Sequence, residues 1–263
     1  MQNMDEPRHA AGGGGSSLSL WYPAFQPRAE ASLRLICFPY AGAGIPVFRA
    51  WPAALPDAIE LRVAQLPGRG TRLREDRFEQ MPPLVEALCR ALYPLADRPL
   101  AFFGHSLGAL VAFELVRKLR CDGVFPVHLF VSGNIAPQLP DPAPPIHQLP
   151  EDGFLRELKN LNGMPQVLLD SKELLEIMLP VVRSDFTLLE TYQYKPEEPL
   201  DCPITAFGGA QDPRTTRNGL EGWRLQTAKS FDLIMMQGDH FFLDSARSLL
   251  LDVISRKLLD DNP

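Results

Sequence analysis

The sequence predicts an α/β fold built on a mostly parallel, doubly wound sheet. Short apolar runs that are typical of buried strands alternate with stretches whose apolar residues recur every three or four positions, as in helices that pack on a sheet. Strands joined through helices run in the same direction, so this alternation favours a parallel sheet. We expect strands at residues 33–38, 60–66, 100–103, 125–132, 204–207 and 231–236, and helices at 84–95, 109–120 and 246–259.

A glycine-flanked serine lies between the strand expected at 100–103 and the helix expected at 109–120. Residues 104–108 read Gly-His-Ser-Leu-Gly. A strand, a G-x-S-x-G turn and a helix in this order form the nucleophile elbow of the α/β-hydrolase fold, which presents the serine hydroxyl above the sheet edge. Side chains at the two outer positions would collide in so tight a turn, which explains why both are glycine. Ser106 is therefore the predicted nucleophile.

One long segment interrupts the alternation and divides the chain into three parts. Residues 135–200 begin proline-rich and continue with helical patterns at 154–161, 171–178 and 181–194. A plain loop is rarely so long, so we expect a helical lid over the active site, with a peripheral subdomain without gating role as the alternative. Residues 31–134 and 201–263 then form the core. Residues 1–30 lack periodicity and are expected to form a flexible tail.

Composition excludes several classes of protein. The 263 residues carry a net charge of −6 and no basic stripe, which argues against a nucleic-acid partner. No apolar run approaches the roughly 18 residues that span a bilayer, and the N-terminus does not resemble a secretory signal. The four cysteines form no C-x-x-C pair and indicate free thiols in the cytoplasm. No cluster has the spacing of metal ligands, so we expect no metal, and a monomer is our default.

A serine hydroxyl needs a base, and the base needs a third group that fixes its tautomer. In this fold the partners follow in the order serine, acid, histidine, each after a later strand. Of five histidines, only His240 follows the last expected strand. Asp212 lies at the carboxyl end of the preceding strand, where open α/β sheets place their chemistry. Asp239, adjacent to His240, and Asp185, in the insertion, are weaker alternatives for the acid.

Two backbone amides are expected to bind the oxyanion of the intermediate. The N–H of Leu107 follows the nucleophile and opens a helix, whose dipole favours negative charge. The second donor should come from the loop after the first core strand, residues 39–44. We expect the N–H of Ala41, with Tyr40 as the neighbouring alternative.

Five short motifs in order resemble those of one family. They are FPYAG at 38–42, LPGR at 66–69, FGHSLG at 103–108, GAQDP at 209–213 and GDHFF at 238–242. The chain is similar to the type II thioesterases, stand-alone enzymes associated with nonribosomal peptide and polyketide synthases. The medium-chain thioesterases of animal fatty-acid synthesis look similar. Matched by position, Ser106, Asp212 and His240 correspond to the triad of the family. Ala43 departs from the pattern, because many members continue with glycine there.

The resemblance implies a substrate and a partner. The substrate would be an acyl group on the phosphopantetheine arm of an acyl or peptidyl carrier protein domain, and the enzyme would remove misloaded or stalled groups. It would need no cofactor of its own. We expect Tyr40, Met178 and Phe186 to bind substrate. Met178 and Phe186 belong to an apolar stripe in the insertion that could line an acyl channel, although packing of the lid on the core would also explain the stripe. The stripe comprises Met178, Leu179, Val182, Phe186 and Leu189.

Other readings stay open at this point. A basic run at Arg69, Arg72, Arg74 and Arg77 could receive an acidic carrier protein or form a solvated face. The same triad would also serve a carboxylesterase or lipase acting on oxygen esters, or an acyltransferase that excludes water. A noncatalytic acyl-binding protein on an old hydrolase fold is a further alternative, against which the intact serine, aspartate and histidine argue.

Overall fold

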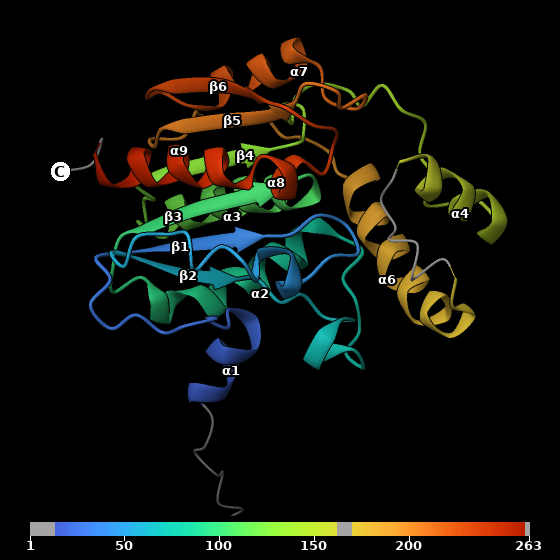
Figure 1. Cartoon of the computed structure of the whole chain (residues 1–263), viewed down its shortest axis with the longest axis horizontal. Coiled ribbons are helices and arrows are strands. Elements are labelled where there is room, and N and C mark those ends of the chain that lie inside the picture. The colour runs from blue at the N-terminus through green and yellow to red at the C-terminus, as the bar shows by residue number, and fades with distance from the viewer. Residues whose placement is uncertain (1–13, 162–169, 261–263) are drawn as a thin grey trace, which may run out of the picture.

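The computed structural model describes residues 14–161 and 170–260, and within them six parallel strands form a single sheet (Figure 1). The strand order is β2-β1-β3-β4-β5-β6, so the chain leaves β1 toward one edge and then returns to the other side of β1. Neighbouring loops therefore diverge between β1 and β3, which is where open α/β sheets bind their ligands. The strands are β1 (Leu33–Phe38), β2 (Ile59–Val63), β3 (Leu100–His105), β4 (His128–Ser132), β5 (Ile204–Gly209) and β6 (Phe231–Met236).

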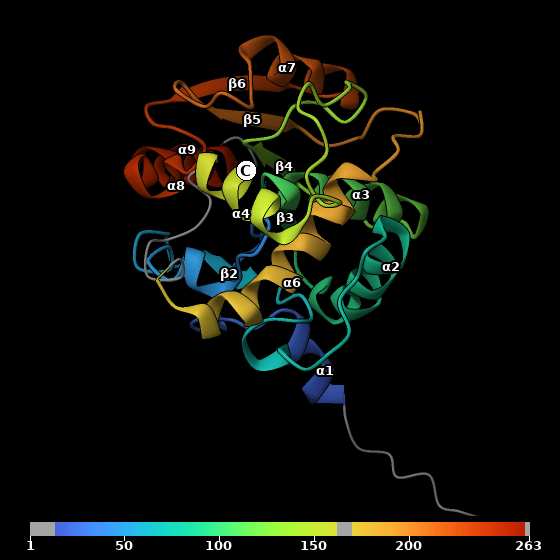
Figure 2. The ribbon, with the colours of Figure 1, turned by 90° about the vertical axis from the view of Figure 1, so that its right-hand side faces the viewer.

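Helices cover both faces of this sheet, as a doubly wound fold requires. Figure 2 shows α2 (Met81–Leu92) and α3 (Leu107–Cys121) on one face, and α8 (Phe242–Ser245) and α9 (Arg247–Leu259) on the other. Alternate strand residues point to opposite faces. Ile36 thus packs in the core that α2 and α3 close, whereas Leu35 packs in the core that α9 closes. The predicted α/β-hydrolase fold, with its mostly parallel sheet, is confirmed.

Several predicted boundaries are shifted, each for a local reason. The strand expected at 60–66 ends at Val63, because Gln65 donates its N–H to the carbonyl of Trp21 instead of continuing the ladder. The strand expected at 125–132 begins only at His128, since Pro126 has no N–H to donate. The remaining short elements are η1 (Ile45–Phe48), η2 (Gly70–Arg72), η3 (Tyr93–Leu95), α7 (Arg217–Glu221) and η4 (Gly222–Gln226).

Within its described residues, the insertion forms two helices beyond the carboxyl ends of the strands (Figures 1 and 2). They are α4 (Glu151–Asn160) and α6 (Lys172–Glu190), and they share a small apolar core that includes Phe154, Leu179 and Phe186. We expected two helices over 171–194, whereas α6 is continuous with Pro180 inside it. A proline removes only one backbone donor, and the buried Leu179, Val181 and Val182 beside it hold the helix through packing. Residues 162–169 lie outside the described residues.

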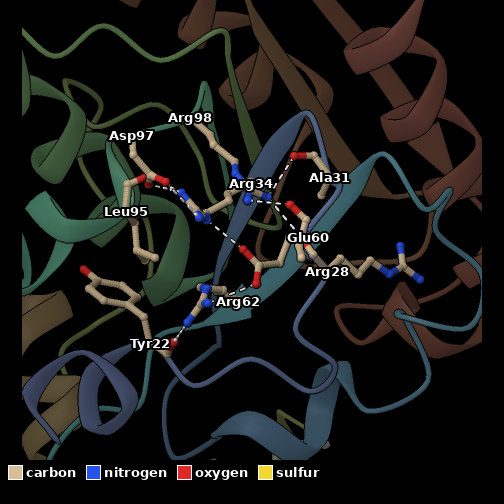
Figure 3. Close-up of polar contacts among 10 residues, drawn as sticks. Tyr22, Arg28, Ala31, Arg34, Glu60, Arg62, Leu95, Asp97 and Arg98 are labelled. Atoms are coloured by element: carbon tan, nitrogen blue, oxygen red, sulfur yellow. Dashed lines mark hydrogen bonds and ion pairs between the residues drawn. The ribbon is translucent and has the colours of Figure 1, made fainter. Parts of the chain in front are cut away.

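The flexible tail expected over residues 1–30 is wrong for its second half. Residues Gly14–Trp21 form helix α1, and the fully buried Tyr22 donates its hydroxyl to the carbonyl of Leu88 at 2.9 Å. Arginine side chains bind the backbone that follows: Arg62 donates to the carbonyl of Tyr22, and Arg98 to that of Ala31 (Figure 3). The composition of the segment suggested disorder, but its carbonyls are fixed by cations from elsewhere in the chain. Residues 1–13 lie outside the described residues.

A buried carboxylate joins Arg62 to a further arginine, Arg34. Glu60 on β2 accepts from Arg34 at 2.6 Å and from Arg62 at 2.9 Å, and it is 3 % exposed (Figure 3). Burial raises the pKa of Glu60, but the hydrogen bonds and charges of Arg34 and Arg62 outweigh it, so that its pKa lies below the ordinary value. The ion pair therefore stabilises the fold fully at pH values above the ordinary glutamate pKa of about 4.3. This stabilisation is lost as the pH falls through the lower pKa that Glu60 has in the folded protein.

Substitution Glu60→Gln is expected to destabilise the protein by about 3 kcal/mol at neutral pH, because it leaves buried guanidinium groups without their carboxylate. Urea unfolding at neutral pH and at about pH 4 measures this, and the difference between wild type and variant should shrink in acid. The control is Glu86→Gln on α2, whose half-exposed carboxylate pairs with Arg90 and Lys118. It should cost less than about 1 kcal/mol. Equal losses in the two variants would refute the assignment.

No helix within the described ranges is long and apolar enough to cross a membrane.

Candidate active site

The turn after β3 holds Ser106 in a backbone conformation that side chains rarely adopt. Its φ of 54° is the only positive φ outside glycine in the described part of the chain. A Cβ on Gly104 would lie 2.1 Å from the carbonyl oxygen of Gly108, and a Cβ on Gly108 would lie 2.1 Å from that of Phe38. Both contacts are with backbone, which cannot move aside. The G-x-S-x-G turn therefore requires its two glycines, and it places Ser106 at the N-terminus of α3.

His105 lies beneath this turn and bridges two of its neighbours. Its Nδ1 is 2.8 Å from Oγ of Ser132, and its Nε2 is 2.8 Å from the carbonyl oxygen of His240. A carbonyl only accepts, so Nε2 donates and Nδ1 accepts from the Ser132 hydroxyl. Complete burial, and then the neighbouring His240, lower the pKa of His105 to about 3. His105 is thus a neutral support for the His240 backbone.

Asp212 and His240 meet across the ends of β5 and β6. Nδ1 of His240 is 2.7 Å from Oδ2 of Asp212, which also accepts from the Thr215 hydroxyl at 2.7 Å. The N–H of Arg214 donates to the other carboxylate oxygen at 2.8 Å. Burial raises the pKa of Asp212, but the hydrogen bond and charge of His240, with the other donors, hold it below the ordinary value. The exposed Asp239 instead accepts from the N–H of Phe241.

Ser106 and His240 line the same small cavity, of about 40 Å³, under the lid. Three further predicted residues line it as well: Tyr40, Ala41 and Phe186. Its other walls come from Leu158, Leu161, Val182, Leu189, Arg214 and Phe241. A serine hydroxyl, an imidazole held by a carboxylate and an apolar compartment thus adjoin one another, which is the set of groups that acyl transfer to a serine needs.

Met178 does not line this cavity, although we expected it to bind substrate. It lies one helical turn before Val182 on α6, and it is half-buried. The predicted stripe contributes Val182, Phe186 and Leu189 to the cavity, while Leu179 packs within the lid core. One part of the stripe therefore lines the cavity and another packs within the lid, and its role in binding an acyl group stays a prediction.

The loop after β1, which carries Tyr40 and Ala41, is held by an ion pair that the sequence did not reveal. Gly42 donates its N–H to Oδ2 of Asp185 at 2.7 Å. Arg69 binds both oxygens of Asp185 at 2.7 Å and donates to the carbonyl of Ala43 at 2.9 Å. Asp185 on α6, an alternative for the acid of the triad, therefore binds this loop, whereas Asp212 binds His240. The only signal of this ion pair in the sequence is the LPGR motif, which contributes Arg69.

The basic run after β2 does not form one surface. Arg69 and Arg72 are buried and paired with Asp185 and Glu75, whereas Arg74 and Arg77 are exposed. A docking surface that includes all four arginines is therefore excluded. Within residues 14–161 and 170–260, no group of three or more histidine, cysteine or acidic side chains could hold a metal ion.

Comparison with known proteins decides the family. The Thioesterase domain model matches residues 33–258, which is most of the chain. The chain belongs to the thioesterase family. This thioesterase is 46% identical over 246 residues to the linear gramicidin dehydrogenase LgrE of Brevibacillus parabrevis, covering 92% of this chain and 94% of that protein. LgrE is named for another activity, but the family model is a thioesterase model. The assignment makes the chain a hydrolase.

Two further relatives carry the name thioesterase. Thioesterase PikA5 of Streptomyces venezuelae is 39% identical over 243 residues, covering 91% of this chain and 86% of the relative. The structure of the type II thioesterase BorB from the borrelidin biosynthetic cluster superposes with a TM-score of 0.84 at 33% identity, covering 91% and 98% of the two chains. The resemblance to type II thioesterases that the five motifs indicate is confirmed.

Proposed function

We propose that this thioesterase hydrolyses acyl thioesters on the phosphopantetheine arm of a carrier protein domain, and so removes misloaded or stalled acyl groups from a synthase. The single observation that carries the proposal is the His240–Asp212 contact at 2.7 Å beside a cavity that Ser106 shares. The named biosynthetic cluster of BorB supports a synthase as the partner. The phosphopantetheine arm belongs to the substrate, so no further cofactor is required, and we place a monomer in the cytoplasm.

The chemistry begins with proton transfer to His240. Nδ1 of His240 faces Asp212, which leaves Nε2 to accept the proton of Ser106 as its Oγ attacks the thioester carbonyl carbon. The carbonyl oxygen becomes an oxyanion, which the N–H groups of Ala41 and Leu107 bind in this mechanism. The carbon–sulfur bond then breaks, the pantetheine thiolate takes the proton from His240, and an acyl-serine remains.

Water completes the reaction. His240 removes a proton from the water as it attacks the acyl-serine, and it returns that proton to Oγ of Ser106 when the acid leaves. The lowered pKa of Asp212 keeps its carboxylate charged, so it stabilises the imidazolium that forms in both halves of the reaction. The side chains of Val182, Phe186 and Leu189 provide an apolar wall for the acyl group.

The proposal predicts a preference for carrier-bound thioesters. A carrier domain loaded with a series of acyl groups should lose them on incubation, with intact mass reporting the free phosphopantetheine thiol. We expect kcat/KM at least about tenfold above that for the p-nitrophenyl ester of the same acid, because binding energy from the carrier lowers the barrier only for the natural substrate.

Two outcomes would contradict the proposal. A preference for the p-nitrophenyl ester would identify an esterase or lipase. Transfer of the acyl group to added glycerol in preference to water would identify an acyltransferase. Incubation of the loaded carrier without enzyme gives the background rate of hydrolysis.

A further inference from the structure

The ion pair between Arg69 and Asp185 joins three segments that are far apart in the sequence. Arg69 follows β2, Asp185 lies in the second half of α6, and both bind the loop after β1. Their side chains are 7% and 2% exposed. The guanidinium and carboxylate meet through two parallel hydrogen bonds of 2.7 Å, the geometry that fixes orientation most strongly.

The loop between them contains the backbone expected to bind the oxyanion. Gly42 is held by Asp185 and Ala43 by Arg69, so that the residue immediately before them, Ala41, is fixed in the wall of the cavity. The N–H of Ala43 also donates to the carbonyl of Tyr40 at 3.0 Å, which closes the loop into a turn. The direction of the Ala41 amide therefore depends on contacts made by the two residues that follow it, Gly42 and Ala43.

Helix α6 packs closely against the same loop. A Cβ on Gly42, whose φ is +76°, would lie 2.7 Å from Cγ2 of Val182. Val182 and Phe186 line the cavity, and Asp185 lies between them on the helix. The acyl wall and the anchor of the loop are thus neighbouring positions of one helix.

We propose that Asp185, oriented by Arg69, is a positioning residue that sets the oxyanion-binding geometry of residues 40–42. It touches no reacting atom and acts through the loop. The proposal rests on the serine-dependent mechanism proposed above. Breaking the ion pair between Asp185 and Arg69 should therefore weaken binding of the transition state and not binding of the substrate.

Substitution Asp185→Asn tests this with the smallest change of shape. The amide oxygen can take the place of Oδ2, which accepts from Gly42 and from one arm of Arg69, but the amide nitrogen that replaces Oδ1 only donates and so opposes the other arm of Arg69. The substitution therefore removes the negative charge and the double hydrogen bond that orients the pair. We expect kcat on a thioester to fall about 10- to 100-fold with KM changed less than about threefold, since complete loss of one oxyanion donor costs about 10²- to 10³-fold. Steady-state kinetics on an acyl-N-acetylcysteamine thioester measure both constants.

Two inhibitors separate oxyanion binding from acyl binding. A thioether-linked octyl trifluoromethyl ketone adds Ser106 Oγ to its carbonyl carbon and becomes a hemiketal alkoxide, while the Ser106 proton passes to His240. The S-octyl thioether of N-acetylcysteamine has no carbonyl at that position. In Asp185→Asn, the Ki of the ketone should rise by the same factor by which kcat/KM falls, and the Ki of the thioether should stay within about twofold of wild type.

The fold offers matched controls for each variant. Glu190→Gln changes a buried carboxylate on the same helix, which binds His147 and the backbone of the proline-rich segment. Arg69→Lys keeps the charge but loses the double hydrogen bond, and should reproduce the effect of Asp185→Asn. Arg72→Lys alters a buried arginine of the same loop that pairs with Glu75 instead. The two controls, Glu190→Gln and Arg72→Lys, should keep kcat and the ketone Ki within about twofold of wild type.

Unchanged kcat and ketone affinity in folded Asp185→Asn would overturn the proposal. Equal weakening of both inhibitors would overturn it as well, because it would indicate general damage to the site. If Asp185→Asn fails to fold, Arg69→Lys decides by the same readouts. The inhibitors need no carrier, so a wild-type enzyme that ignores acyl carriers but binds the ketone would refute the proposed substrate and leave this test intact.

Discussion

Substitution Ser106→Ala is expected to lower kcat on an acyl thioester by at least about 10⁴-fold, because removal of the nucleophile prevents the acyl-serine from forming. The φ of 54° at this position makes any side chain strained, and alanine adds no bulk to that of serine. The variant should therefore fold. Intact mass after treatment with a fluorophosphonate provides a second measurement, with one adduct expected on wild type and none on the variant.

A second buried serine provides the control for this experiment. The hydroxyl of Ser184 on α6 donates to the carbonyl of Val181 within its own helix, away from the cavity lining. Ser184→Ala should react with the fluorophosphonate as wild type does. Full labelling of Ser106→Ala would disprove the assignment of the nucleophile.

Substitution Asp212→Asn is expected to lower kcat by about 10⁴-fold. An asparagine side chain can turn its amide toward His240, which stabilises the tautomer that carries its proton on the nitrogen facing Ser106 and leaves no base there. In the wild-type protein, the hydrogen bonds from Thr215 and Arg214 orient the Asp212 carboxylate. Single-turnover kinetics of acylation, followed by release of the thiol, measure the loss directly.

Asp239→Asn is the matched control, since Asp239 adjoins His240 in sequence but binds the N–H of Phe241. Its kcat should remain within about twofold of wild type. Comparable losses in the two variants would show that the acid had been assigned wrongly. Because the pKa of Asp212 is lowered and that of His105 is about 3, neither group titrates above about pH 5. A kcat/KM profile measured above about pH 5 should therefore show no limb that arises from either of these two groups.

The sequence predicted the sheet and the groups that meet at its edge because both rest on local patterns. Parallel strands leave short apolar runs, and a turn that forces a positive φ at Ser106 leaves glycines at fixed distances. Chain order alone then led to Asp212 and His240, since this fold places each after a later strand. These inferences require no knowledge of how side chains pack.

Interactions between distant segments were missed for the complementary reason. Nothing in the spacing of Arg69 and Asp185 shows that 116 residues of chain bring them together around one loop. His105 has no predicted role, since only His240 follows the last expected strand, yet its two ring nitrogens bridge Ser132 and His240. Helix α1 was predicted to be part of a flexible tail, because composition does not reveal which arginines bind the backbone that follows this helix.

The second half of α6 connects the lid to the loop beside the serine. It is anchored to the β1 loop through Asp185, and it also holds α4, because Phe186 and Arg183 both pack against Phe154. A shift of this half would therefore displace the cavity wall at Leu158 and Leu161 together with the β1 loop. Changes to these contacts that alter the size of the acyl group accepted are thus expected to alter the rate of bond cleavage as well.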